Sequence, residues 1–127
     1  MAGFLRVPDD ETDDHIVERQ ARFAALLGAA RSSVWQADED GEFRYTHLWS
    51  ADAADPLPSA AELPASRCFP WVMTRLEAGE LIAFSSLDDV PHPQDRATYA
   101  RIGTRSGVVV PLESNRKLFG CMTFATV

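Results

Sequence analysis

Cysteine is scarce in this sequence, and it contains neither a long apolar run nor an excess of basic residues. The two cysteines, Cys68 and Cys121, lie far apart and form no metal-ligand spacing with each other or with histidine. This spacing excludes a disulfide scaffold and a structural zinc site. No apolar run approaches the ~20 residues of a membrane span, and residues 1–10 lack the regions of a signal peptide. We therefore expect a cytoplasmic chain that does not contact membranes.

Acidic residues outnumber basic ones, with 19 Asp and Glu against 12 Lys and Arg and a net charge of −7. Nucleic-acid binding that is independent of base sequence requires a basic surface, so we expect no nucleic-acid partner. The acid excess lies in the first two thirds of the chain, whereas residues 80–127 are neutral overall and contain several arginines. A length of 127 residues predicts a single domain over residues 1–127.

The first half of the chain combines a helical pattern with an alternating one. An acidic run at 9–14 precedes apolar residues at helical spacing, which predicts a helix over about 12–27 that ends at Gly28. Two strands, over 33–37 and 42–49, are expected to be joined by a two-residue hairpin turn at Asp40-Gly41. The residues of the second strand that are expected to share one face are Phe43, Tyr45, His47 and Trp49.

The second half of the chain predicts short helices and strands separated by turns. Residues 51–67 are rich in Ala, Pro and Ser, which is typical of a surface loop. Helices are expected over about 70–78 and 95–102, because Gly79 and Gly103 directly follow these segments. Strands over 80–84, 108–112 and 118–124 complete the pattern, the last two around a turn at Asn115. Tight turns between neighbouring strands favour an antiparallel sheet with separate helices, so the predicted fold class is α+β.

Four stretches of the sequence, taken in order, resemble a known family. They are Ser33-Val34-Trp35-Gln36 with Asp38-Glu39-Asp40-Gly41, then Thr46-His47-Leu48-Trp49, then Phe69-Pro70-Trp71 to Leu76-Glu77-Ala78-Gly79-Glu80, and last Ser86-Leu87-Asp88-Asp89-Val90-Pro91 through Asp95-Arg96 and Gly103-Thr104-Arg105-Ser106 to Val110-Pro111-Leu112 and Gly120. In this combination the chain resembles the GAF domains of bacterial signal-transduction proteins. The resemblance implies a PAS/GAF-like central antiparallel sheet with helices on both faces and a ligand cavity roofed by short helices and loops.

The resemblance also implies a regulatory function. Such domains precede histidine kinases, diguanylate cyclases and sigma-factor activators, as in two-component systems, and pass a signal through a C-terminal helix. This sequence ends at Val127, directly after the last strand, so we interpret it as a sensor module that lacks its C-terminal signalling helix. We expect it to bind a small-molecule ligand and to act on a covalently attached output domain. The sequence does not specify a cofactor.

An alternative function is a ligand-free module for dimerisation and signal transmission, whose interior is filled by its own aromatic side chains. A sensor predicts a cavity of a few hundred Å³ with convergent polar groups, whereas the alternative predicts no cavity. In either case the first helix carries more apolar surface than one sheet face needs. We therefore expect a homodimer that uses this helix.

The resemblance places the expected ligand-binding residues under and within the segment 95–106. Arginine suits an anionic ligand, and we expect Arg105 to contribute most, because Gly103 frees the chain before it. For the aromatic residues, a purely structural role in the core is the alternative, and for the arginines it is pairing with nearby acids such as Asp88, Asp89 or Asp95. The expected ligand-binding residues are Trp49, Phe69, Trp71, Phe84, Arg96, Tyr99, Arg101, Arg105 and Ser106.

Catalytic patterns are missing from the sequence. There is no G-x-S-x-G, no P-loop and no paired-carboxylate pattern, so we expect neither catalytic residues nor an enzyme. Some GAF-fold proteins reduce methionine sulfoxide with cysteines. Here Cys121 lies in an apolar strand and Cys68 stands alone, which disfavours that activity. Because Phe69 follows Cys68, the sequence does not match a bilin attachment site. A lone His47 is more typical of a core residue than of a metal ligand.

Overall fold

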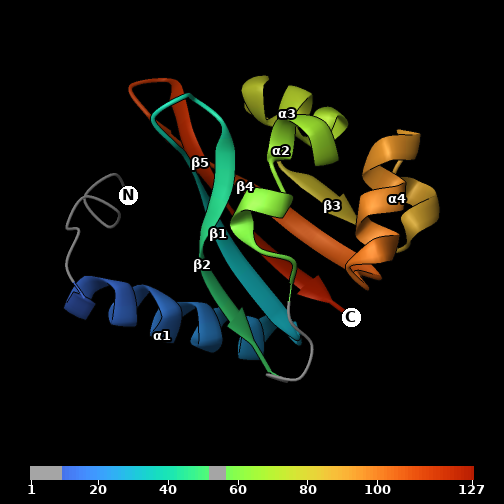
Figure 1. The fold of residues 1–127 in the computed structure, drawn as a ribbon. Helices are drawn as coiled ribbons and strands as arrows, with labels where there is room; N and C mark the ends of the chain where they lie inside the picture. Colours follow the sequence, from blue (N-terminus) through green and yellow to red (C-terminus); the bar gives the residue numbers. More distant parts are fainter. Residues whose placement is uncertain (1–9, 52–56) are drawn as a thin grey trace.

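The computed structural model describes residues 10–51 and 57–127, with the side chains of its first helix described from Asp14 onward. Five antiparallel strands form one sheet in the order β2-β1-β5-β4-β3. Helix α1 lies on one face of this sheet, and α2, α3 and α4 cover the other (Figure 1). The elements are α1 (Asp10–Leu27), β1 (Arg31–Ala37), β2 (Phe43–Ser50), η2 (Ala60–Glu62), α2 (Ala65–Cys68), α3 (Pro70–Glu77), β3 (Ile82–Phe84), η3 (Leu87–Asp89), α4 (Pro93–Arg101), β4 (Ser106–Ser114) and β5 (Lys117–Thr126).

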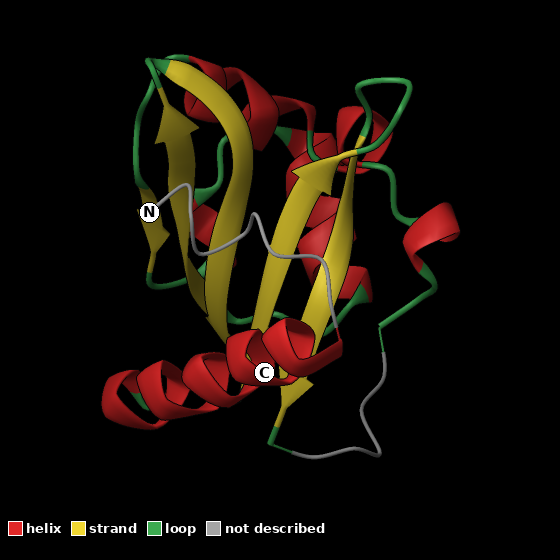
Figure 2. Cartoon of the chain, turned by 90° about the vertical axis from the view of Figure 1, so that its left-hand side faces the viewer, coloured by secondary structure: helices red, strands yellow, loops and turns green. Residues whose placement is uncertain are grey.

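This architecture confirms the predicted α+β fold with helices on both faces of the sheet. The first helix ends at Leu27 as expected, and Gly28 follows it with a φ of 69°, the left-handed conformation that glycine adopts without strain. Figure 2 shows α1 crossing the strands near one end of the sheet. The described residues include no helix that is both long and apolar enough to cross a membrane.

The buried stripe of α1 differs from the expected one. Ile16, Gln20 and Ala24 are the buried residues at helical spacing, whereas Phe23 and Leu27 are 51% and 62% exposed. Gln20 is polar, and its Nε2 donates a hydrogen bond of 3.2 Å to Ser32 Oγ on β1. Helix α1 therefore packs on the sheet through a narrow face, and larger apolar side chains near its C-terminal end remain exposed.

The hairpin between β1 and β2 has a three-residue loop, so the expected two-residue turn is wrong. The backbone N–H of Asp38 donates to the carbonyl of Glu42 at 2.8 Å and closes the loop. Within it, Asp38 Oδ1 accepts from the N–H groups of Asp40 and Glu42, and Gly41 alone takes a positive φ. The β4–β5 turn is the true two-residue hairpin, because Asn115 and Arg116 both have positive φ.

A β-bulge at Thr46 interrupts the alternation of side chains between the two faces of β2, which was expected to be regular. Trp35 pairs with Tyr45, but the preceding Val34 pairs with His47, so Thr46 is an extra residue in β2. The bulge shifts the alternation by one residue. Tyr45 therefore shares the face of Trp35, whereas His47 and Trp49 lie on the face that carries α1. The expectation that all four side chains share one face is wrong for this reason.

The main core lies between the sheet and α2, α3 and α4. Among its aromatic side chains, Trp35 and Phe69 contact each other edge to face, with ring centroids 5.8 Å apart. A carboxylate joins two of the covering helices. Asp95 of α4 is fully buried and accepts from the backbone N–H groups of Trp71 (3.1 Å) and Val72 (2.9 Å) in the first turn of α3. These donors are left unpaired by the helix itself, so Asp95 caps α3 from another helix.

Replacement of Asp95 is expected to weaken the contact between α3 and α4 and so to lower the stability of the fold. Asp95→Ala leaves the buried N–H of Val72 and the partly buried N–H of Trp71 without this acceptor, which predicts a loss of about 3 kcal/mol in the free energy of unfolding. Asp95→Asn retains one acceptor oxygen and should cost less. Urea denaturation measures both, with the exposed Asp88→Ala as the control that should change stability by less than about 0.5 kcal/mol. Equal effects of Asp95→Ala and Asp88→Ala would contradict the capping role.

Candidate functional site

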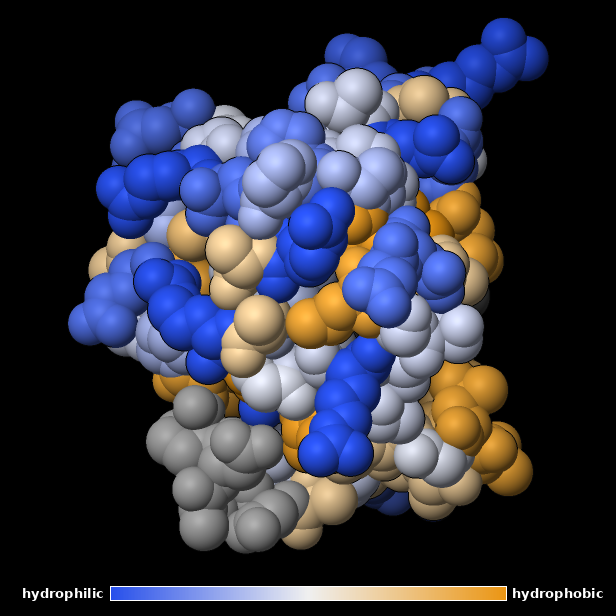
Figure 3. All heavy atoms as spheres, turned by 90° about the vertical axis from the view of Figure 1, so that its right-hand side faces the viewer, coloured by the Kyte–Doolittle hydropathy of each residue, from blue (hydrophilic) through white to orange (hydrophobic). Residues whose placement is uncertain are grey.

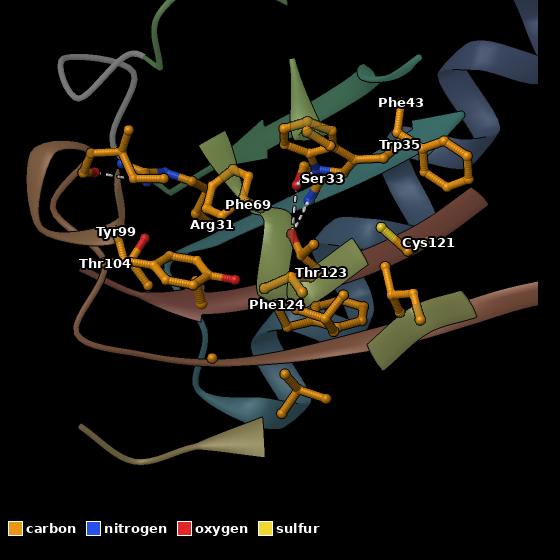
Figure 4. A pocket seen from close by; sticks show the side chains of 18 of the residues that line it. Arg31, Ser33, Trp35, Phe43, Phe69, Tyr99, Thr104, Cys121, Thr123 and Phe124 are labelled. Atoms are coloured by element: carbon orange, nitrogen blue, oxygen red, sulfur yellow. Dashed lines mark hydrogen bonds between the residues drawn. The ribbon is translucent and has the colours of Figure 1, made fainter. Parts of the chain in front are cut away.

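A cavity of about 60 Å³ lies between the sheet and the covering helices α3 and α4. Much of its wall is apolar and comes from residues such as Phe69, Leu76, Phe84 and Val109. Polar side chains from β1, α4 and β5 enter the same wall, as the close view shows (Figure 4). The cavity is smaller than the few hundred Å³ expected from the sequence, yet it is present and it has polar groups. The polar residues that line it are Arg31, Ser33, Tyr99, Thr104 and Thr123.

A hydrogen-bond network connects three of the lining side chains. Trp35 Nε1 donates to Ser33 Oγ at 2.8 Å, and the Ser33 backbone N–H donates to Thr123 Oγ1 at 3.1 Å. The two hydroxyl oxygens of Ser33 and Thr123 are 2.5 Å apart, so one hydroxyl donates to the other. The pair holds two hydroxyl hydrogens and uses one of them for this bond. Whichever residue donates, one hydrogen remains that can donate to a further acceptor.

Tyr99 brings a second donor to the cavity. Its ring lies against Phe69 and Phe84, with centroid distances of 4.9 and 4.8 Å, and only 8% of the residue is exposed. Figure 4 shows its hydroxyl directed into the cavity. Burial, together with the nearby Cys121 and Asp95, raises the pKa of Tyr99 far above its ordinary value of 10.0. The hydroxyl therefore stays protonated and acts as a hydrogen-bond donor.

Arg31 lines the cavity and is not among the residues expected from the sequence. It is 4% exposed, and its Nη1 donates a 3.0 Å hydrogen bond to the carbonyl of Ile102, which joins the start of β1 to the end of α4. Arg31 occupies the same face as Ser33 and Trp35, because strand residues two apart share a face. Extending the alternating pattern two residues before Ser33 would have indicated this position.

The structure brings three of the nine expected ligand-binding residues to the cavity wall. These are Phe69, Phe84 and Tyr99, all of which belong to the aromatic core. Ser106 instead lines a hollow beside Leu27 and Phe124, and its hydroxyl lies 2.7 Å from Thr126 Oγ1. Ligand contact by any of the nine stays a prediction. The residues that do not line the cavity are Trp49, Trp71, Arg96, Arg101 and Arg105.

The expected arginine cluster does not converge on the cavity. Arg96 donates from Nε to the carbonyl of Val90 at 3.1 Å and from Nη2 to that of Pro91 at 3.3 Å, so it supports the loop before α4. Arg101 and Arg105 are exposed, and Arg105 is fixed by its backbone N–H, which donates to the carbonyl of Thr126 at 2.9 Å. On the side of the molecule that carries α4, hydrophilic residues cover most of the surface (Figure 3).

Both cysteines are buried and free, with 4% exposure each. Cys121 lines the cavity from β5, and burial raises the pKa of its thiol from 9.0 to about 12. A thiol in this state is a weak nucleophile at neutral pH. In the described part of the chain, no group of three His, Cys, Asp or Glu residues is placed to hold a metal ion.

The sequence model of the GAF domain matches residues 15–126. The chain therefore belongs to the GAF domain family, whose domains serve as sensory and regulatory modules. No curated protein matches the sequence.

Solved structures share the fold at low sequence identity. A nitrate-binding-site mutant of NreA from Staphylococcus aureus is 10% identical, with a TM-score of 0.68 over 90% of this chain and 84% of that one. A domain assigned to a two-component sensor histidine kinase of Sinorhizobium meliloti 1021 is 15% identical, with a TM-score of 0.69 over 93% and 75%. The phycocyanobilin-bound GAF domain of a cyanobacterial phytochrome is 18% identical, with a TM-score of 0.70 over 90% and 69%.

The buried Cys121 thiol predicts a loss of stability in alkaline solution. Its pKa is higher in the folded chain than the ordinary 9.0, so the thiol stabilises the fold fully below pH 9 and loses this contribution as the pH rises toward 12. Between pH 9 and 10.5, the free energy of unfolding of the wild type should fall more steeply than that of Cys121→Ala. The excess slope approaches about 1.4 kcal/mol per pH unit. Urea denaturation at several pH values measures it, and parallel curves would contradict the burial of a protonated thiol.

Proposed function

We propose that this GAF domain is a sensor module that binds a small molecule in the cavity and passes its occupancy to an attached output domain. The observation that carries the proposal is a cavity between the sheet and the helices, whose wall holds the inward-directed Tyr99 hydroxyl and the spare hydrogen of the Ser33–Thr123 pair. Hydroxyl donors on a mostly apolar wall favour a ligand that carries a hydrogen-bond acceptor. A cavity filled entirely by its own aromatic side chains would present neither donor.

The sheet offers a short route from the cavity to α1. Ser33 and Thr123 face the cavity, and the next residues along their strands, Ser32 and Phe124, pair with each other on the side that carries α1. Ser32 accepts a hydrogen bond from Gln20, and the ring of Phe124 lies 6.4 Å from that of Phe23. A ligand that shifts Ser33 or Thr123 therefore acts on residues that hold α1. The relative from Sinorhizobium meliloti supports the proposal that the output is a kinase or a similar domain.

A library of small metabolites tests the sensor proposal. A ligand at a hundred times its Kd should raise the free energy of unfolding by about 2.7 kcal/mol. It should also change amide hydrogen exchange in α1, because of the route through Ser32 and Phe124. Val109→Leu adds a methylene to the cavity wall and should weaken binding, whereas Val110→Leu, on the opposite sheet face, should not. A library without any stabilising compound, or binding that leaves α1 exchange unchanged, would contradict the proposal.

A second function, dimerisation, is favoured by the exposed apolar side chains of α1. Phe23, Leu26 and Leu27 are 51%, 82% and 62% exposed, and they lie on one side of the last two turns of the helix. Side chains of this kind commonly mark a surface that contacts another protein. We propose that a second copy of the chain covers them, since homodimers are the commonest oligomers.

Negative charges introduced among the exposed apolar side chains of α1 should dissociate the proposed dimer into monomers. We expect the double variant Leu26→Glu with Leu27→Glu to remain folded and monomeric, because both side chains are more than half exposed. Multi-angle light scattering between 10 and 500 µM, on the order of dissociation constants of weak dimers, should show a dimer for the wild type. Leu81→Glu is the control, because Leu81 is 56% exposed but lies between α3 and β3. A monomeric wild type would contradict the dimer.

A further inference from the structure

We propose that the C-terminal end of α1 from a second copy of the chain packs into an open hollow beside α1, and that the two copies exchange this contact symmetrically. The inference rests on the dimer proposed above and assigns the surface that receives the exposed side chains of α1. The hollow has a volume of about 560 Å³ and lies between the end of α1 and the strands β3, β4 and β5. Among its lining residues are Leu27, Ala83, Asp89, Val108 and Phe124.

The hollow differs from the cavity under α3 and α4 because it is open to solvent. Ala83, Ser85 and Asp89 on its wall are exposed, and Val108 is half-buried. A small molecule bound there would keep one side in water, whereas pockets for small molecules enclose most of the ligand surface. An open surface with apolar side chains is more typical of a contact between proteins.

The hollow and the exposed side chains of α1 form one continuous apolar surface. Leu27 belongs to both, because it is 62% exposed and also lines the hollow. The ring of Phe23 lies edge to face against that of Phe124, a lining residue, with centroids 6.4 Å apart. A symmetric dimer requires a surface that is complementary to itself. This surface combines exposed apolar side chains with a hollow that can receive them, so a second copy of the chain is a suitable partner.

The charges on the two parts of this surface are opposite. Asp89 is the only charged residue among the described residues that line the hollow. Hydrogen bonds from the backbone N–H and the hydroxyl of Ser85 lower the pKa of Asp89, so its carboxylate is ionised at neutral pH. Residues 19–27 of α1 include two arginines but no acidic residue. An exposed pair such as Arg22–Glu18 contributes little to stability, so it does not prevent a contact between Arg22 and Asp89 of the other copy.

Disulfide formation between single-cysteine variants tests the contact directly. Leu26→Cys places a thiol on α1 and Ala83→Cys places one in the hollow, and both variants should fold because both positions are exposed. A disulfide forms only where two Cα atoms come within about 7 Å of each other. We expect an oxidised mixture of the two variants to give the disulfide between positions 26 and 83 as its main product. Each chain carries one of the new cysteines, so this bond forms only between copies.

Ser59→Cys provides the matched control for Ala83→Cys. Ser59 is also exposed, but it precedes η2, which contacts β2 through the bond from Arg44 Nη1 to the carbonyl of Ala60. Strand β2 lies at the opposite edge of the sheet from β3. A mixture of Leu26→Cys and Ser59→Cys should therefore give only the background yield of the wild type, whose two cysteines are buried.

The dimer should also depend on the charge of Asp89. Asp89→Asn removes the charge and keeps a side-chain oxygen that can accept from Ser85, and it should raise the Kd of the dimer about threefold. Asp88→Asn removes the same charge from an exposed neighbour that does not line the hollow, so the Kd should remain that of the wild type. Sedimentation equilibrium measures both values, and equal Kd values for the two variants would overturn the inference.

The remaining outcomes separate this inference from the dimer proposal. A predominant disulfide between two copies of Leu26→Cys would show that the two α1 helices contact each other, which overturns the inference and leaves the dimer intact. Equal yields of mixed disulfide with Ala83→Cys and with Ser59→Cys would also overturn the inference alone. A wild type that stays monomeric in light scattering contradicts both proposals.

Discussion

The interior of this domain depends on one buried carboxylate. Asp95 reaches from α4 to the first N–H groups of α3, and both helices lie over the same face of the sheet. A charged group this deeply buried is tolerated only where it accepts strong hydrogen bonds, so the two helices are fixed relative to each other. Thr98, one turn later on α4, donates to the carbonyl of Cys68 at 2.7 Å and secures α2 as well. Tyr99 follows directly, and its place in the cavity wall is a consequence of these contacts.

The remaining space in the core follows from the shapes of the residues around it. Phe69 and Phe84 are large and rigid, and each contacts Tyr99 at a tilted angle. Gly107 lies opposite Phe84, where an added Cβ would be 3.1 Å from the ring. A larger residue at this position would move the ring and change the cavity. The cavity therefore results from aromatic packing on one side and small residues on the sheet.

The α+β fold could be predicted from the sequence because its signals are local. Gly28, Gly79 and Gly103 follow α1, α3 and α4 and take the positive φ expected of a glycine after a helix. The bulge at Thr46 has no such local signal, since it depends on how β2 pairs with β1, and it placed Trp49 on the other face. The sequence indicates Arg96, Arg101 and Arg105 only through their position in the chain. The arginine that lines the cavity, Arg31, belongs to a strand more than sixty residues earlier, and only the tertiary fold joins them.

The size of the cavity limits how strongly a ligand can act on an output domain. A ligand of about five non-hydrogen atoms binds with at most about 7 kcal/mol. Reversing a two-state equilibrium from 1:99 to 99:1 requires about 5.5 kcal/mol of difference in binding between the two states. One small ligand thus approaches this requirement only if nearly all its binding energy is specific for one state. In a homodimer two ligands act on one equilibrium, and the requirement for each is halved. The exposed Leu26 and Leu27 of α1 and the small cavity therefore agree with the proposed dimeric sensor, in which two bound ligands together supply the free energy that one small ligand lacks.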